Sequence, residues 1–329
     1  MGGRMNRRDF IVFTSSSIVA VPFSASAQNT AKVYRIGSLN ISGPADKTPY
    51  GPLLVRNLAQ HGYLLDKNLT FEHRGAEMQL NRLPELVDEL KASKVDVVFA
   101  LGYPAALAMK GTTLPVVSYT TGDPVGTGLV ESLARPGGNI TGISDVSAQV
   151  TPKRLGLLRE VAPTMRRVAV LFNAADLGMT LRYRTAAEWA KAQSISVQPL
   201  GVREPNDFDA AFSAMTQHRP DALFLVTDAL TVLNRKRVIE FTAAHRIPAM
   251  YEFDFLVRDG GLMSYGASQE ENLRLAAGYV DRVLKGAAPS SLPVERPSRY
   301  YLAINLKTAR SLGLTIPQSV LVRADQVIE

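Results

Sequence analysis

Short apolar runs alternate with amphipathic segments along most of the chain. The runs lie at 34–39, 95–101, 115–119, 168–172, 222–226 and 249–251. They are nearly continuous in apolar character, which is typical of parallel strands covered on both faces. Between two of them, Leu83, Leu86, Val87 and Leu90 follow the spacing of one helix face. The pattern predicts βαβ units and doubly wound parallel sheets, which is an α/β fold.

The chain also resembles itself. The order Asp, strand, helix, Pro, strand runs from Asp96 to Pro115 and occurs again from Asp221 to Pro248. Any two βαβ units share some of this pattern, so chance similarity is the alternative. A true duplication predicts two similar lobes.

A length of 329 residues also favours two domains. We assign 32–145 plus 261–296 to the first lobe and 146–253 plus 299–329 to the second, with a ligand cleft between them. In this division the Pro-rich segment 289–297 crosses the surface. Several crossings between lobes predict a multi-strand hinge that closes around a ligand.

The first 27 residues have the character of an export signal. A short basic segment is followed by an apolar stretch and an A-x-A-like site that ends at Ala27. The pair Arg7 and Arg8, followed by Phe10, favours a twin-arginine signal. A plain secretory signal and a buried N-terminal helix are the alternatives. Cleavage near Ala27 leaves Gln28 as the first residue.

Charge and cysteine content narrow the function. The net charge is +7, of which the signal contributes +2, so +5 remains on the rest of the chain. The basic residues are dispersed, which does not indicate nucleic-acid binding. Cysteine is absent, which excludes disulfides, thiol chemistry and the lipid anchor of a lipoprotein. We therefore expect a protein that is free in the periplasm.

Ligands of parallel sheets bind beyond the carboxyl ends of the strands, so the residues there are the candidate site. Those of the first lobe are Asn40, Ser42, Tyr50, Gly102, Tyr103, Pro104, Tyr119 and Asp123. Those of the second lobe are Asn173, Thr227, Asp228, Tyr251 and Glu252, with Asp176 in the loop after Asn173.

This mixture of rings, hydroxyls and acids suits a small zwitterion or an aromatic solute. The helix start at Pro104 favours a carboxylate, and Asp228 or Glu252 would hold an ammonium. Each residue has a plainer alternative. Asp228 would serve as a helix N-cap, Glu252 as a solvated charge, and Tyr103 and Tyr251 as packing at the rim.

Signals of catalysis are weak. The four histidines are scattered and lack metal-ligand spacing. The glycines at 122, 126 and 128 match neither a P-loop nor a dinucleotide turn, and no G-x-S-x-G elbow occurs. We therefore expect no metal, no cofactor and no enzyme activity.

Several strings resemble the ABC transporter substrate-binding protein family, among the relatives of tryptophan/tyrosine-type binding proteins. They are found at 82–86, 123–130, 133–142, 219–223, 260–266, 292–295 and 304–309. The resemblance implies the type I periplasmic-binding fold, a solute between two lobes, and a permease with its ATPase as partners. Amino-acid-binding relatives often have a small hydroxyl residue before the Pro of the Gly-x-Pro-Ala turn. Tyr103 departs from that pattern, so their specificity does not transfer directly.

Three hypotheses follow. The first is a monomeric receptor that delivers a small solute to an importer. The second is a ligand-sensing module that works with a membrane sensor, and the third, least supported, is a periplasmic enzyme.

Overall fold

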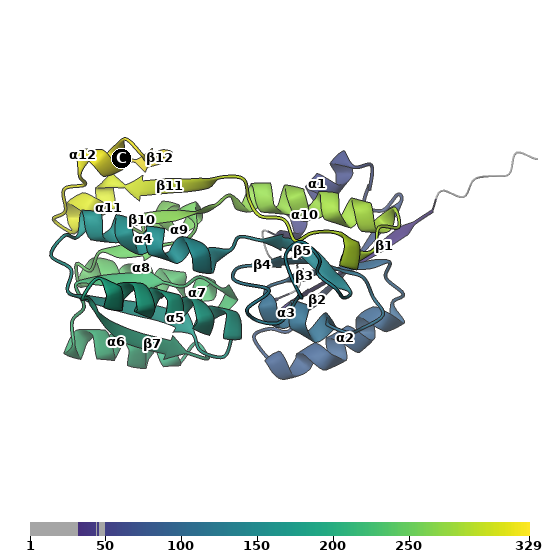
Figure 1. The fold of residues 1–329 in the computed structure, drawn as a ribbon, viewed down its shortest axis with the longest axis horizontal. Helices are drawn as coiled ribbons and strands as arrows, with labels where there is room; N and C mark the ends of the chain where they lie inside the picture. The colour runs from purple at the N-terminus through teal and green to yellow at the C-terminus, as the bar shows by residue number, and fades with distance from the viewer. Residues whose placement is uncertain (1–31, 44, 46–49) are drawn as a thin grey trace, which may run out of the picture. The chain divides into compact units, whose positions relative to one another are not determined.

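The structure is a computed structural model that describes residues 32–43, 45 and 50–329. Within it, residues 33–329 form one unit (Figure 1). The predicted export signal at 1–27 lies outside the described residues. Among the residues described, no helix is long and apolar enough to cross a membrane.

The first lobe is built on a parallel sheet. In the described part of the chain this sheet has five strands in the order β2-β1-β3-β4-β5. The strands are β1 (Tyr34–Asn40), β2 (Leu69–Gly75), β3 (Val97–Leu101), β4 (Val116–Thr120) and β5 (Ile140–Ser144). The helices of this lobe are α1 (Tyr50–Gln60), η2 (Leu80–Arg82), α2 (Leu83–Ala92), α3 (Tyr103–Met109), α10 (Gln269–Leu284) and η3 (Pro289–Ser291).

The second lobe is built on a larger sheet. Its seven strands within the described residues have the order β12-β11-β10-β9-β8-β6-β7, and only the β10–β11 pair is antiparallel. The strands are β6 (Arg167–Asn173), β7 (Ser196–Val202), β8 (Ala222–Leu225), β9 (Ala249–Tyr251), β10 (Met263–Ala267), β11 (Tyr300–Asn305) and β12 (Gln326–Ile328). The helices are α4 (Ser147–Val161), α5 (Leu177–Ala192), α6 (Asp207–Gln217), α7 (Ala229–Leu233), α8 (Arg235–Ala244), α9 (Asp254–Arg258), α11 (Leu306–Ser311) and α12 (Gln318–Leu321).

Both sheets are covered on both faces, as the continuous apolar runs predict. Along β3, Val98 and Ala100 pack under α2 and α3, whereas Val97 and Phe99 pack under α1 and α10. Along β8, alternate residues likewise divide between a core under α4 and α5 and a core under α6 and α8. This double covering explains why these strands are apolar at successive positions.

The two sheets repeat one topology. The order β2-β1-β3-β4-β5 recurs as β7-β6-β8-β9-β10, and β11 and β12 extend the second sheet. The prediction of two similar doubly wound lobes is therefore confirmed. The Asp–strand–helix–Pro–strand pattern corresponds to β3 through β4 and to β8 through β9.

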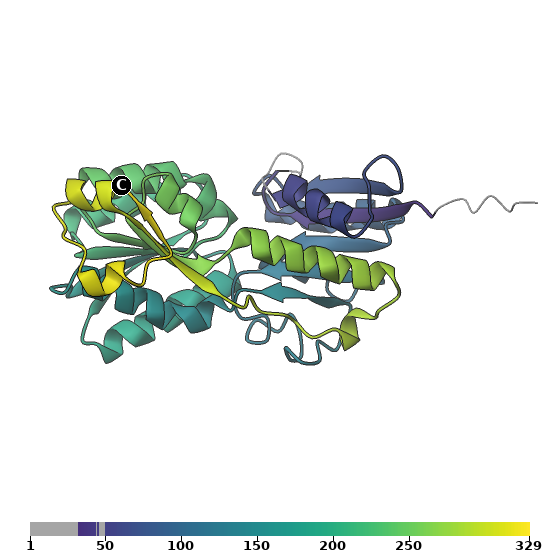
Figure 2. The ribbon, with the colours of Figure 1, turned by 90° about the horizontal axis from the view of Figure 1, so that it is seen from above.

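Within residues 50–329 the chain passes between the lobes three times, after β5, after β10 and before β11 (Figures 1 and 2). Helix α4 follows a strand of the first sheet but packs on the second. Helix α10 follows a strand of the second sheet but packs on the first, beside α1.

One assigned boundary differs from the structure. We placed 261–266 in the first lobe, but β10 pairs with β9 and β11 in the second sheet. The chain changes lobe only after this strand, at Ser268, whose side chain caps α10. The sequence pattern of 261–266 shows a strand but does not show which sheet it joins, because pairing depends on tertiary contacts.

Candidate functional site

The loops at the carboxyl ends of the two sheets are in contact. A Cβ atom at Gly178, near the start of α5, would lie 3.8 Å from Cβ of Tyr103 in the first lobe. A Cβ atom at Gly122, after β4, would lie 3.8 Å from Cδ of Arg182 in the second lobe. Ala229 of α7 packs against the core of the first lobe. We call this zone of contact between the strand-end loops the interlobe seam.

On the first-lobe side, two tyrosines are held by the crossover helix α10. Gln269 Nε2 donates to the hydroxyl of Tyr50 at 3.1 Å, and Asn272 Nδ2 donates to that of Tyr119 at 3.0 Å. Burial raises the pKa of Tyr50 and raises that of Tyr119 well above its ordinary value. Both hydroxyls therefore stay protonated and neutral.

Asn40 and Ser42 lie where β1 ends. Asn40 is buried, and its Oδ1 accepts a hydrogen bond of 2.8 Å from the hydroxyl of Ser42. The pair places one amide and one hydroxyl at the first strand end, next to the strand β3 that leads to Tyr103.

The turn Gly102–Tyr103–Pro104 enters α3 as predicted. Gly102 has a φ of 89°, a conformation that favours glycine, and Pro104 lies in the first turn of the helix. Burial raises the pKa of Tyr103, and the nearby charge of Asp176 raises it further. The Cβ of Tyr103 lies beside Gly178 of the second lobe, and its hydroxyl donates to the carbonyl of Thr127 in its own lobe at 3.4 Å.

Asp123 serves its own loop in this structure. The side-chain Oδ1 of Asp123 accepts from the backbone N–H of Val125 at 3.0 Å. The backbone carbonyl of Asp123 accepts from the backbone N–H of Thr127. This pattern stabilises the turn after β4, so the carboxylate of Asp123 has a local role.

On the second-lobe side, Asn173 and Asp228 are joined. Asn173 Nδ2 donates to Asp228 Oδ2 at 2.6 Å, and Asn173 Oδ1 accepts from the backbone of Ala175. Asp228 is also the N-cap of α7 and forms a reciprocal capping box with Thr231. The structure thus shows Asp228 as an N-cap, which was the alternative. Its Oδ1 makes the cap, and its Oδ2 faces Asn173 at the strand end.

Tyr251 and Glu252 differ from their predicted roles. Tyr251 is fully buried in the core beneath α8, with its hydroxyl 3.5 Å from Thr242 Oγ1, because alternation along β9 turns its ring away from the seam. Glu252 is not solvated but completely buried. Its carboxylate accepts from Arg182 and from the backbone N–H of Thr227 at 3.2 Å, and it forms an ion pair with Arg154 at 3.1 Å, so it is already neutralised by the protein's own arginines.

Two arginines at the seam were missed from the sequence. Arg154 of α4 and Arg182 of α5 are both fully buried. Arg182 lies on the same helix face as Met179, Ala186 and Ala190, which are also buried. A charged residue on an otherwise apolar helix face was the signal that could have identified it.

These arginines belong to a buried group with two acids, Glu252 and Asp145. Burial lowers the pKa of each arginine to about 10, and the charge of Asp145 opposes that shift. Burial raises the pKa of Asp145, and the two arginines oppose that change in turn. The four charges balance, which is how a buried ionic group becomes tolerable.

Asp176 adds a further acid beside Asp228. Its Oδ1 caps α5 by accepting from Gly178 N at 2.7 Å and from Met179 N at 3.3 Å. Burial raises the pKa of Asp176 to about 6, and the charge of Asp228 raises it further. Among the described residues, neither Asp176 nor Asp228 forms a salt bridge.

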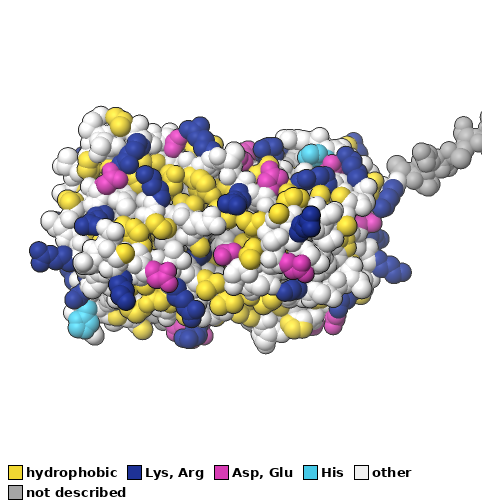
Figure 3. All heavy atoms as spheres, viewed as in Figure 1, with side chains coloured by type: hydrophobic (Ala, Val, Ile, Leu, Met, Phe, Trp, Pro, Cys, Tyr) yellow, Lys and Arg dark blue, Asp and Glu magenta, His cyan; other side chains and the backbone are white. Residues whose placement is uncertain are grey.

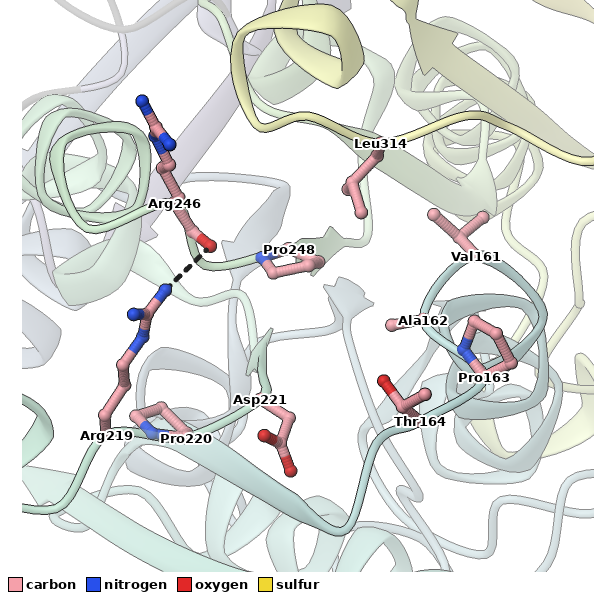
Figure 4. A pocket seen from close by; sticks show the side chains of 10 residues that line it. All are labelled: Val161, Ala162, Pro163, Thr164, Arg219, Pro220, Asp221, Arg246, Pro248 and Leu314. Atoms are coloured by element: carbon pink, nitrogen blue, oxygen red, sulfur yellow. Dashed lines mark hydrogen bonds between the residues drawn. The ribbon is translucent and has the colours of Figure 1, made fainter.

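A separate hollow lies near the amino ends of β6, β8 and β9 in the second sheet (Figure 4). It has a volume of about 380 Å³ and is lined in part by Pro163, Pro220 and Pro248. Asp221, which also lines it, accepts from the backbone N–H groups of Arg166 and Arg167. This hollow is distant from the strand-end loops, and its carboxylate is committed to backbone contacts.

Across the described residues, no group of three or more His, Asp or Glu side chains is arranged to hold a metal ion. The seam offers hydrogen-bond donors and acceptors, aromatic rings and buried charges of both signs. This is the chemistry of a site for a small polar ligand.

The fold and the seam define a two-lobed α/β binding protein of the type I periplasmic-binding class. The model of the ABC transporter substrate-binding protein family matches residues 39–328. The chain therefore belongs to this family, whose role is to bind a substrate.

Three similar proteins agree with this assignment. The chain is similar to a tyrosine-binding protein of Clostridioides difficile (strain R20291), with 25% identity over 82% of this chain and 77% of the relative. It is also similar to the crystal structure of an ABC domain in complex with L-Trp from Streptococcus pneumonia, with 27% identity, a TM-score of 0.80, and 90% and 99% of the two chains covered. A conserved domain protein from Vibrio cholerae O1 biovar El Tor gives a TM-score of 0.84 at 25% identity, with 90% of this chain and all of the other covered.

Proposed function

We propose that this protein is the periplasmic solute-binding component of an ABC importer. In this role it captures an amino-acid-like or small aromatic carboxylate solute between its lobes and delivers it to the permease and its ATPase. The observation that carries the proposal is the seam, where buried polar groups of both sheets converge at the strand ends. The tyrosine and tryptophan named for two relatives support the choice of solute class.

The proposed contacts are residues at the carboxyl ends of the strands of both sheets. They are Asn40, Ser42, Tyr50, Gly102, Tyr103, Pro104, Tyr119, Asn173, Thr227 and Asp228. The three crossings between the lobes are the proposed hinge. On the face drawn in Figure 3, Lys and Arg side chains are interspersed with Asp and Glu side chains.

A thermal-shift screen tests the binding role. The purified protein is heated with L-tyrosine, L-tryptophan, the other amino acids and a set of aromatic carboxylic acids. A solute present at about 100 times its Kd stabilises the protein by about 2.7 kcal/mol, which raises the Tm by several degrees. Small-angle scattering with that solute should show a smaller radius of gyration.

Matched variants locate the site. Asn173→Ala removes a seam residue and should abolish the shift. Asn305→Ala removes an N-cap after β11, at the edge of the sheet away from the seam, and should leave the shift unchanged. If no solute changes the Tm and native mass spectrometry of fresh protein detects no bound molecule, the receptor role is wrong.

Export is tested separately. Substrate-binding proteins of this family are usually exported, and we propose that residues 1–27 direct a monomeric protein to the periplasm. N-terminal sequencing of the periplasmic form should begin at Gln28. Replacing Arg7 and Arg8 by Lys should block export through the twin-arginine route, whereas a plain secretory signal would tolerate the change.

A further inference from the structure

Four exposed arginines lie where the chain enters three neighbouring strands of the second sheet. They are Arg166 and Arg167 at the start of β6, Arg219 before β8 and Arg246 before β9. Among the described residues, none of these four arginines forms a salt bridge. Their charges are therefore exposed to solvent and are not paired with an acid of this part of the chain.

Hydrogen bonds hold the three loops together at one end of the lobe. Asp221 Oδ2 accepts from the backbone N–H of Arg166 at 2.8 Å and from that of Arg167 at 2.9 Å. Arg219 Nη2 donates to the backbone carbonyl of Arg246 at 3.5 Å. Four arginines and one aspartate give this end a charge of +3, which is more than half of the +5 on residues 28–329. We call these five residues the basic pole.

The hollow near the amino ends of these strands lies within the basic pole. Arg219 and Arg246 line it together with apolar side chains, and Figure 4 shows these arginines on one side and Leu314 and Val161 on the other. The apolar residues include Pro163, Pro220 and Pro248, and the volume is about 380 Å³. An anionic headgroup that has an apolar chain finds a partner for each of its parts here. A soluble polyanion would leave the apolar hollow unfilled.

The basic pole and the interlobe seam lie at opposite ends of the same strands. The pole is at the amino ends of β6, β8 and β9, and the seam is at their carboxyl ends. Strand β6 runs from Arg167 to Asn173 and spans about 20 Å at about 3.3 Å per residue. A large partner on the basic pole therefore leaves the loops of the seam open to solutes.

We propose that the basic pole attaches this protein to an anionic phospholipid membrane while the seam stays free. A guanidinium presents donors in a planar fork that fits the oxygens of a phosphate, and every cation of the pole is an arginine. An anionic membrane surface attracts each basic side chain that lies within a Debye length of it. The attachment holds the protein beside the membrane in which the proposed permease lies.

Co-sedimentation with vesicles tests the attachment. The protein begins at Gln28, because the basic and apolar residues of 1–27 would themselves bind a membrane, and residues 33–329 form one unit. The vesicles contain phosphatidylcholine alone, or phosphatidylcholine with an equal amount of phosphatidylglycerol, which is anionic. Polyglutamate is the soluble polyanion for comparison.

Two double variants with the same change in net charge are compared. The pole variant combines Arg219→Gln with Arg246→Gln, and the control combines Lys67→Gln with Arg135→Gln at exposed positions of the first lobe. Each basic side chain near an anionic surface strengthens attachment about fivefold, so the pole variant should bind the mixed vesicles about 25-fold more weakly and the control at most about twofold. Salt at about 1 M shortens the Debye length to about 3 Å and should release the wild-type protein.

Three outcomes would overturn the proposal. They are equal sedimentation with the two kinds of vesicle, equal binding by the pole variant and the control, and binding to polyglutamate without binding to vesicles. The pole variant should keep the rise in Tm that a solute produces in the wild-type protein. If the vesicles bind the protein but no solute raises its Tm, the receptor role fails and the attachment stands.

Discussion

The two lobes have the same strand order but present different chemistry at the ends of their strands. In the first lobe most strand-end groups are neutral, chiefly Asn40 and the hydroxyls of Tyr50 and Tyr119, and the buried acid Asp145 follows β5. In the second lobe the strand ends have buried charges, with Arg182 and Glu252 in direct contact. The two lobes therefore share one backbone topology but differ in the side chains of the loops that follow their strands.

At the opposite ends of the strands the lobes remain alike. Asp96 accepts from the backbone N–H of Arg35 at 2.7 Å, as Asp221 does from that of Arg167 at 2.9 Å. Each central strand also bonds to a proline carbonyl, Pro115 in one lobe and Pro248 in the other. Contacts that hold the sheet recur in both lobes, whereas contacts at the seam do not.

The largest expected loss of stability comes from removing the acid that the two buried arginines of the second lobe share. Glu252→Gln leaves Arg154 and Arg182 buried without their shared counter-charge and should lower the free energy of unfolding by about 3–5 kcal/mol. Urea denaturation measures this loss. Glu270→Gln, which removes an exposed ion pair with Arg56, should cost less than about 1 kcal/mol. Equal stability of the two variants would contradict the importance of the buried group.

The next effect concerns pH and Asp176. Its pKa of about 6 in the folded protein exceeds the ordinary value, so between about pH 4 and pH 6 the folded state holds a proton that the unfolded state has lost. The free energy of unfolding should therefore fall as the pH rises through this range, by roughly 2–3 kcal/mol from this group.

Asp176→Asn isolates that contribution, because other buried acids titrate in both proteins. The stability of the wild-type protein relative to Asp176→Asn should decline from about pH 4 to about pH 7. A constant difference between the two proteins across this range would show that Asp176 ionises normally.

The smallest expected loss of stability tests whether equivalent aspartates at the amino ends of the strands contribute equally in the two lobes. Asp96→Ala and Asp221→Ala should each lower the free energy of unfolding by about 1 kcal/mol, because each removes an acceptor of backbone N–H groups. The loss at Asp221 should be the larger, since its carboxylate also accepts from Arg166. Asp88→Ala, which removes an exposed pair with Lys91, should change stability by less than about 0.5 kcal/mol. A large loss in one lobe and none in the other would contradict their equivalence.

Much of the fold could be predicted from the sequence because burial on both faces makes inner strands such as β3 and β8 apolar throughout, unlike the edge strands β2 and β7. The runs at 95–101 and 222–226 correspond to β3 and β8, and the repeated Asp and Pro residues correspond to equivalent backbone contacts. The lobe to which 261–266 belongs could not be predicted, because a strand's pattern does not identify its neighbours.

The site was less predictable. Residues that follow strands in the chain, such as Asn173 and Tyr103, can be found because strand ends are visible in the sequence. Arg154 and Arg182 come from the middle of helices, and their direction depends on how those helices pack. Glu252 is adjacent to a strand end, but its burial depends on the two arginines and so could not be read from its position.

The exchange of helices between the lobes has a consequence for how the protein unfolds. Leu273 and Val280 of α10 cover Val97 and Phe99 of the first sheet, although α10 is connected to the second. A fragment that ends before α10 would expose that apolar face to water, and a fragment that begins after β5 would include α10 without the sheet it covers. We therefore expect neither half of the chain to be stable alone, and the two lobes to melt in one cooperative transition.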